Sequence, residues 1–310
     1  MNSATTTEGA PDGGVGLSAL AGATVTCTAL DTCVRHYAEC LDYRLVSQGV
    51  VDEALATLWQ APRQTGRPFA ILRPAIGGGD QWVRFVEGPV ADTPPFRTFG
   101  WNALEISVRD VVDLKQRLEG SVFERLSGPH FLANGTSSIQ AMQVLGPAGE
   151  VLYLTQIPDE PDKAHLPQAR VAVDRLFIAV LGVPDAAAAQ DWYASRFDVT
   201  RRPPRTAMLR ALNQAYGFEE TRQHLLASVR LTRQGMIEID GYPLEARSRE
   251  ARPGYLPGGI SSVTVFADQV PPTFADRGVR IDAFPYGGAW VAALQGTAGE
   301  RLELVCEATP

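Results

Sequence analysis

The sequence predicts an α+β fold built from four βαβββ units that form two pairs. Two observations carry this prediction. A closing strand-like segment occurs as AGEVLYL at 148–154 and, 150 positions later, as AGERLEL at 298–304. Such self-similarity indicates a duplicated module. In addition, a strand-like segment that ends in an Asp and precedes a helix-like segment occurs four times along the chain.

The four aspartates set the order of the expected elements. They are Asp31, Asp110, Asp185 and Asp268, at spacings of 79, 75 and 83 residues. We expect each to cap a helix, because an Asp carboxylate accepts the free N–H groups of a first helical turn. Strand-like segments follow the first and third helices, at 69–73, 81–86, 224–232 and 236–240. Each unit therefore reads as strand, helix and three strands.

Composition excludes several classes of protein. The 310 residues are 45% hydrophobic and 20% charged, with a net charge of −7, which is the balance of an ordinary globular chain. The negative charge disfavours nucleic-acid and anionic-membrane partners, since both require basic surfaces. The four cysteines form no CxxC pair, so we expect reduced thiols in a cytoplasmic protein. We expect a small-molecule substrate and either a monomer or a homodimer.

Four such units in two pairs, each pair ending in Ala-Gly-Glu-x-Leu-x-Leu, resemble the vicinal oxygen chelate superfamily, which includes glyoxalase I, extradiol dioxygenases and bleomycin-resistance proteins. The resemblance implies curled mixed sheets whose concave faces form cups that hold the active site. It also suggests the domain boundaries. Residues 1–21 would be a disordered tail, 22–157 a first glyoxalase-like module pair, 158–173 a linker and 174–307 a second pair.

The divalent metal of that family should be held by a residue seven before each capping Asp and by a residue of each closing strand. The first kind of position is occupied here by Thr24, Ala103, Ile178 and Ser261, and the second by Tyr153 and Glu303. Only Glu303 among them is a good ligand. We therefore expect no metal and no other cofactor, and the alternative is one divalent metal in a rearranged site.

Strand alternation indicates which side chains enter the second cup, because neighbouring residues point to opposite faces of a sheet. Glu238 and Asp240 alternate with apolar residues, and so does Glu303. We expect these acids, with His224, to supply general acid–base groups, and Arg230 to bind a substrate carboxylate or to stabilise an enolate. Ser261 is a further candidate for substrate binding.

The first cup should be drier. Trp59, Trp101 and Tyr153 are candidates for an aromatic binding pocket, and Glu105 shares the inward parity of Ala103. His130 lies in the sequence Gly-Pro-His-Phe, which we expect to be a loop over the cup, where it could act as an acid or base.

The function expected is that of a metal-independent acid–base enzyme, an isomerase, epimerase or lyase. Its substrate would be a small or medium-sized organic compound with a carbonyl group, aromatic catabolites included. Two alternatives remain open. One is a non-catalytic binding protein of the antibiotic-sequestering type, and the other is a metal-dependent dioxygenase or glyoxalase-like lyase. One scaffold hosts many chemistries, so the fold does not decide between them.

Overall fold

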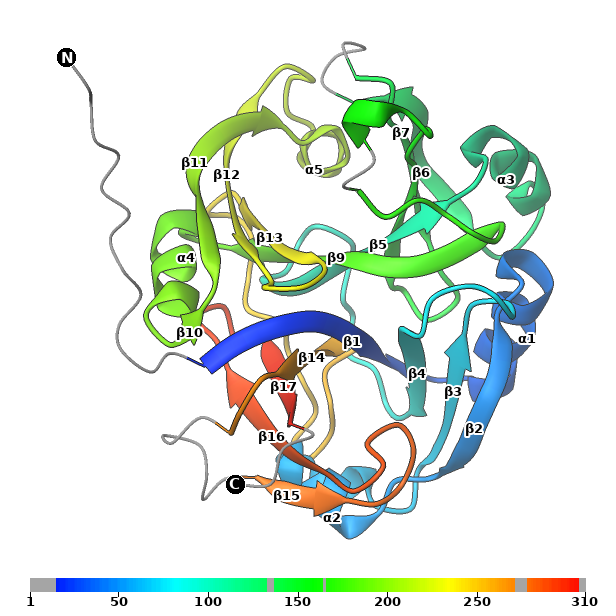
Figure 1. Ribbon diagram of the computed structural model, residues 1–310, viewed down its shortest axis with the longest axis vertical. Coiled ribbons are helices and arrows are strands. Elements are labelled where there is room, and N and C mark those ends of the chain that lie inside the picture. Colours follow the sequence, from blue (N-terminus) through cyan, green and yellow to red (C-terminus); the bar gives the residue numbers. More distant parts are fainter. Residues whose placement is uncertain (1–14, 133–136, 164–165, 271–277, 307–310) are drawn as a thin grey trace.

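A computed structural model describes residues 15–132, 137–163, 166–270 and 278–306 of the chain. Their strands fall into the four expected units, which we call unit 1 (15–87), unit 2 (100–156), unit 3 (173–241) and unit 4 (259–306). Figure 1 shows two curled sheets, one above the other, with helices around them. The predicted α+β architecture with curled mixed sheets is confirmed. No helix in these ranges is long and apolar enough to cross a membrane.

The upper sheet in Figure 1 is made by units 2 and 3, in the order β11-β12-β13-β9-β5-β8-β7-β6. Its two central strands are antiparallel, and each has a parallel neighbour on its other side. The strands are β5 (Gly100–Val108), β6 (Glu124–Phe131), β7 (Gln140–Leu145), β8 (Val151–Gln156), β9 (Val173–Val183), β11 (Thr200–Met208), β12 (Gln223–Arg230) and β13 (Met236–Gly241).

The lower sheet is made by units 1 and 4, in the order β15-β16-β17-β14-β1-β4-β3-β2, with β10 beside β1. Its strands are β1 (Val15–Cys27), β2 (Arg44–Val50), β3 (Pro68–Arg73), β4 (Trp82–Glu87), β10 (Phe197–Asp198), β14 (Gly259–Ala267), β15 (Val279–Ile281), β16 (Ala289–Gln295) and β17 (Arg301–Cys306). The helices are α1 (Leu30–Leu41), α2 (Glu53–Leu58), α3 (Val111–Leu118), α4 (Ala186–Ala194) and α5 (Arg210–Tyr216).

The pairing of units differs from the expectation that consecutive units share a cup. Unit 1 pairs with unit 4 through β1 and β14, and unit 2 pairs with unit 3 through β5 and β9. The first strand of every unit is buried along nearly its whole length, so burial does not indicate which first strands pair. The difference decides which of the expected site residues meet.

Two of the four expected helix caps are confirmed. Asp110 and Asp185 cap α3 and α4 through their carboxylates. Asp31 does not cap α1, because the helix begins at Leu30 and Ala29 is its N-cap, which leaves Asp31 in the first turn. The helix expected after Asp268 lies outside the described residues. Residues 15–21, which we assigned to the tail, belong to β1.

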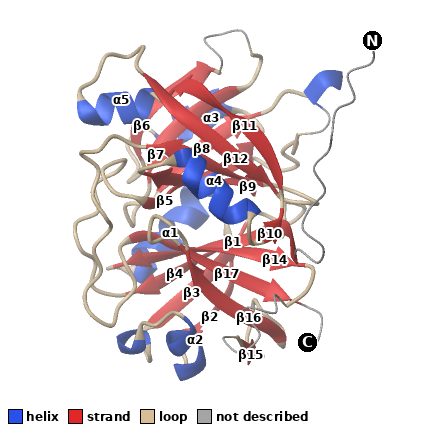
Figure 2. Cartoon of the chain, turned by 90° about the vertical axis from the view of Figure 1, so that its left-hand side faces the viewer, coloured by secondary structure: helices blue, strands red, loops and turns tan. Residues whose placement is uncertain are grey.

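Figure 2 shows the two sheets stacked with α1 and α4 at the level between them. One hydrophobic core joins both sheets, with Leu17, Leu104 and Leu302 among its fully buried members. Each cup has its own smaller apolar cluster on the concave side. In the lower cup α2 supplies Leu55 and is followed by Trp59, and in the upper cup α5 supplies Leu212. The helices that enter the cups therefore decide how much space each cup keeps.

Candidate functional site

The lower cup is closed, and a buried ion pair lies at its centre. Arg84 on β4 and Glu303 on β17 approach to 3.2 Å between Nη2 and Oε1, and their side chains are 1% and 0% exposed. Tyr286 donates to Glu303 at 2.7 Å and Trp59 donates to it at 2.8 Å. The Arg84 guanidinium also lies over the rings of Trp59, Trp82 and Tyr286. We call the lower cup the closed cup.

The closed cup does not fit the divalent metal of the family. Glu303 occupies a metal-ligand position, but the cation beside it is Arg84, which also donates to the Thr24 hydroxyl at 2.8 Å. A guanidinium keeps its charge at any ordinary pH, so a divalent cation here would face an uncompensated positive neighbour. Two expected site residues, Glu303 and Trp59, thus form part of a packed polar core.

The upper cup contains a cavity of about 440 Å³, and we call it the open cup. Acidic and polar side chains converge on it from both halves of the sheet. Glu105, Gln143 and Tyr153 come from unit 2, and Glu238 and Arg205 come from unit 3. Of the expected residues, the structure brings together Glu105, Tyr153, His130, Glu238 and Asp240 in this cup.

The carboxylates of the open cup are desolvated and close enough to influence one another. Burial and the Glu238 charge raise the pKa of Glu105 to about 8, although the Thr155 hydroxyl donates to Glu105 at 2.7 Å. Burial also raises the pKa of Glu238, with Arg205 acting in the opposite direction. The pKa of Asp240 is raised well above its usual range, first by burial and then by Glu238. Such shifts favour a proton shared within the cluster near neutral pH.

Two further features of the cluster concern hydrogen bonding. Asp240 is 2% exposed, and its Oδ1 has no hydrogen-bond partner among the described residues. The buried Oε1 of Gln143 also has none within this part of the chain. Tyr153 lies opposite Glu105 across the β5–β8 pair. Burial raises the pKa of its phenol well above the usual value, so the phenol stays protonated and can donate. Gln143 and Tyr153 both line the cavity, so a free amide oxygen and a phenol donor are available there to bind a polar ligand.

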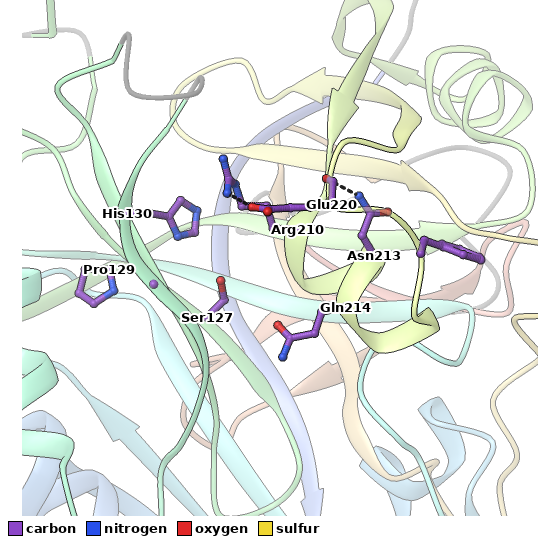
Figure 3. A pocket seen from close by; sticks show the side chains of 9 residues that line it. Ser127, Pro129, His130, Arg210, Asn213, Gln214 and Glu220 are labelled. Carbon is purple, nitrogen blue, oxygen red and sulfur yellow. Dashed lines mark hydrogen bonds and ion pairs between the residues drawn. The ribbon is translucent and has the colours of Figure 1, made fainter.

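A second cavity of about 600 Å³ adjoins the open cup at α5. Figure 3 shows His130 on β6 facing Arg210 at the start of α5, with Asn213 and Gln214 on the same helix. His130 and Arg210 line both cavities, so the two spaces share a wall. His130 lies in β6 rather than in the expected loop. Burial and Arg210 lower the pKa of His130, which keeps it neutral near pH 7.

The remaining expected residues lie elsewhere. His224 is 7% exposed and contacts the Asn213 carboxamide at 2.6 Å between Nε2 and Oδ1, so it supports α5 from behind the cavity. Arg230 is exposed at the end of β12 and lines neither cavity. Trp101 and Ser261 line a separate cavity between the two sheets.

Sequence reasoning missed Arg205 and Arg84. Arg205 lies on β11, whose sequence TRRPPRTAM contains two prolines that argue against a strand. The strand tolerates them because it is the edge of the sheet, where a missing N–H costs no ladder bond. The signal that could have identified both residues is an Arg on a strand at inward parity.

The open cup does not fit the family's metal either. Within the described part of the chain no three His, Cys, Asp or Glu side chains are grouped so that they could hold a metal ion. At the positions that the family uses, Ile178 is apolar and Tyr153 is a protonated phenol. Catalytic zinc sites, by comparison, have three protein ligands.

Comparison with known proteins places this geometry in a fold family. The fold is similar to those of a glyoxalase I and a proposed dioxygenase, in agreement with the fold that the sequence resemblance implied. Glyoxalase I from Zea mays superposes with a TM-score of 0.61 at 15% identity over 93% of this chain and 92% of that chain. A proposed dioxygenase from Bacillus subtilis superposes with a TM-score of 0.63 at 12% identity over 95% and 86%. No family model and no curated protein sequence matches the chain.

Proposed function

We propose that the open cup is the active site of a metal-independent acid–base enzyme, an isomerase, epimerase or lyase. Its substrate is a small or medium-sized organic compound with a carbonyl group. The observation that supports this most directly is the group of carboxylates with raised pKa that faces a cavity of about 440 Å³. A general base works best when its pKa lies near the working pH, and burial achieves this for a carboxylate.

The proposal gives each group a role. Glu238 is partly exposed to the cavity and lies near Arg205, which favours its ionised form, so Glu238 removes a proton from the carbon next to the carbonyl. The electron pair moves to the carbonyl oxygen, and Arg205 and the Tyr153 phenol stabilise the enolate. Glu105, with a pKa of about 8, holds a proton at neutral pH.

The same two groups, Glu238 as the base and Glu105 as the protonated acid, serve each of the proposed reactions. In an isomerisation or epimerisation the proton returns to carbon, either at another position or on the opposite face. In an elimination the leaving group departs from the next carbon and takes a proton from Glu105. Acid–base assistance of this kind contributes about 10²–10⁴ in rate, and positioning contributes further.

Deuterium exchange tests the proposal without knowledge of the product. The protein is incubated in D₂O with a panel of carbonyl compounds, and loss of the proton next to the carbonyl is followed by NMR. We expect Glu238→Gln to lower the exchange rate by about 10²-fold or more. Glu124→Gln is the matched control, because Glu124 is exposed on β6 of the same sheet.

The alternative of a binding protein predicts a different outcome. A non-catalytic protein would return every compound unchanged and unlabelled, and Glu238→Gln would alter affinity alone. Compounds that bind in the open cup without exchange or conversion would therefore favour sequestration over catalysis.

A further inference from the structure

A third cavity of about 450 Å³ lies where the two sheets meet, outside both cups, and we call it the junction cavity. It is bounded by the first residues of β5, β14 and β17 and by the segment before β14. Residues from all four of these segments line it, among them Trp101, Arg249, Tyr255, Ile260, Ser261 and Arg301.

Arg249 lines this cavity without an acidic partner. It donates to the Thr98 hydroxyl at 3.3 Å and to the carbonyl oxygens of Ile260 and Trp101, each at 2.7 Å. All three acceptors are neutral, and no carboxylate of the described chain lies within ion-pair distance of the guanidinium. Burial lowers the pKa of Arg249 to about 10. These hydrogen bonds fix the position of the Arg249 guanidinium, but no carboxylate of the described residues balances its charge.

Arg301 is a second cation of the same kind. The indole of Trp101 donates to the Arg301 carbonyl oxygen at 2.7 Å, which fixes the backbone. Among the described residues its guanidinium has no hydrogen-bond acceptor and no ion-pair partner. Burial lowers the pKa of Arg301, and the charge of Glu303 only partly opposes this effect.

The acidic residue that lines the junction cavity already has hydrogen-bond donors. Glu300 also lines the cavity, but its carboxylate accepts from the Tyr193 hydroxyl at 3.1 Å and from the Ala298 backbone N–H at 2.8 Å. The junction cavity therefore contains two half-buried, partly desolvated cations beside aromatic surface from Trp101 and Tyr255. Desolvated cations gain most from a charge-assisted bond to an anion.

We propose that the junction cavity binds a small organic anion, whose oxyanion group contacts Arg249 and Arg301 and whose apolar body packs against Trp101 and Tyr255. A guanidinium presents paired N–H groups that match a carboxylate or a phosphate. The apolar wall favours an organic acid over a free inorganic ion. The inference concerns a second site and is independent of the reaction proposed for the open cup.

Isothermal titration calorimetry on the full chain tests this inference, with benzoate and inorganic phosphate as probes. We expect benzoate to bind more tightly than phosphate. Arg301→Gln should weaken benzoate binding about tenfold or more, because it removes one charge-assisted contact. Arg249→Gln is the second variant. Arg44→Gln is the control, since Arg44 is exposed on β2.

Arg205→Gln separates this site from the open cup, which also contains an arginine. Binding that survives Arg205→Gln and falls in both junction variants supports the inference. Binding that is lost in Arg205→Gln but kept in Arg301→Gln overturns it. A result in which neither benzoate nor phosphate binds overturns it as well. Phosphate binding equal to that of benzoate would contradict the organic part of the ligand.

Discussion

Two buried acid clusters in this chain differ in what neutralises them. Glu303 in the closed cup is balanced by Arg84 and three hydroxyl or indole donors, from Tyr286, Thr264 and Trp59. In the open cup, Arg205 partly offsets the burial of Glu238 and Asp240, and Glu105 accepts a hydrogen bond from the neutral Thr155 hydroxyl. The first cluster therefore stabilises a charge permanently, whereas the second holds protons that can be exchanged.

Stability should fall as the pH rises through the range in which the open cup loses its protons. The pKa of Glu105 is raised from its usual 4.5 to about 8, so the folded chain binds this proton more tightly than the unfolded chain does. The stabilisation is complete below pH 4.5 and is lost between about pH 4.5 and 8, by an amount on the order of a few kcal/mol. Urea denaturation at pH 6 and pH 9 measures it.

Glu105→Gln isolates this contribution, because a carboxamide does not titrate. The variant should lose less stability than the wild type between the two pH values, while Glu124→Gln should behave as the wild type. An equal loss in Glu105→Gln and wild type would show that the folded protein does not hold the proton at this residue.

Removing one partner of the closed-cup ion pair should be strongly destabilising. Arg84→Met leaves Glu303 buried without its counter-charge, and such changes cost about 3–5 kcal/mol. The double variant Arg84→Met/Glu303→Gln should be more stable than the single variant, since the uncompensated charge is gone. Urea denaturation of the single and double variants tests this expectation, with Arg44→Met as the surface control. A cost below about 1 kcal/mol for Arg84→Met would contradict the structural role.

The residues of the candidate site were predictable only in part. Strand alternation placed Glu238, Asp240 and Glu105 correctly on concave faces, because parity depends on neighbours in the same strand. It could not tell that Glu303 and Glu238 face different cups, because that depends on which strands pair across 200 residues or so. Arg205 was missed because its strand has an atypical composition.

At the scale of the elements, the repeated Ala-Gly-Glu segment has a structural explanation. Glu150 and Glu300 are buried, and each carboxylate accepts a hydrogen bond from a tyrosine hydroxyl on an earlier helix. Tyr37 on α1 donates to Glu150, and Tyr193 on α4 donates to Glu300. A Cβ at Gly146 would lie 2.0 Å from the Glu150 carboxylate oxygen, and at Gly296 the corresponding distance is 1.8 Å. The repeat therefore preserves a turn that encloses a carboxylate.

Removing either tyrosine hydroxyl should destabilise the protein by about 1–3 kcal/mol, because a buried carboxylate oxygen loses its donor. Tyr37→Phe and Tyr193→Phe can be compared with the wild type by thermal or urea denaturation. Tyr216→Phe is the control, since the Tyr216 hydroxyl has no hydrogen-bond partner in the structure. Equal effects of all three changes would show that the hydrogen bonds to Glu150 and Glu300 do not add measurably to the stability of the protein.

The sequence predicted elements where a local signal decided them. Asp110 and Asp185 mark helix starts because capping is a contact within a few residues. The prediction that Asp31 caps the first helix was wrong, because this helix begins at Leu30 and has no side-chain cap. The extension of β1 to Val15 was not predictable from a Gly- and Ala-rich segment, because its strand conformation comes from pairing with β10 and β14.

At the scale of the whole molecule, neither half of the chain contains a complete sheet. A chain divided between residues 160 and 161 would separate β1 from β14 and β5 from β9. Each central strand is buried along almost its whole length. Each fragment would then expose a long apolar strand edge.

Co-expression of the two fragments tests this dependence. We expect residues 1–160 and 161–310 to co-purify as one complex, and each fragment alone to self-associate. Size-exclusion chromatography and circular dichroism distinguish these states. Two fragments that are each monomeric and melt cooperatively would instead show that the halves are independent domains, as the boundaries drawn from the sequence suppose.

The pairing of the first unit with the last also affects how the chain folds while it is being synthesised. Synthesis proceeds from the N-terminus, so units 2 and 3 can assemble their sheet while unit 4 is still being translated. Unit 1, made first, must wait for β14 and β17, which come about 240 residues or more after the start of β1. During that interval β1 pairs only with β4 of its own unit, and its other apolar edge has no partner. A chaperone that binds exposed strand edges would therefore bind this protein at unit 1.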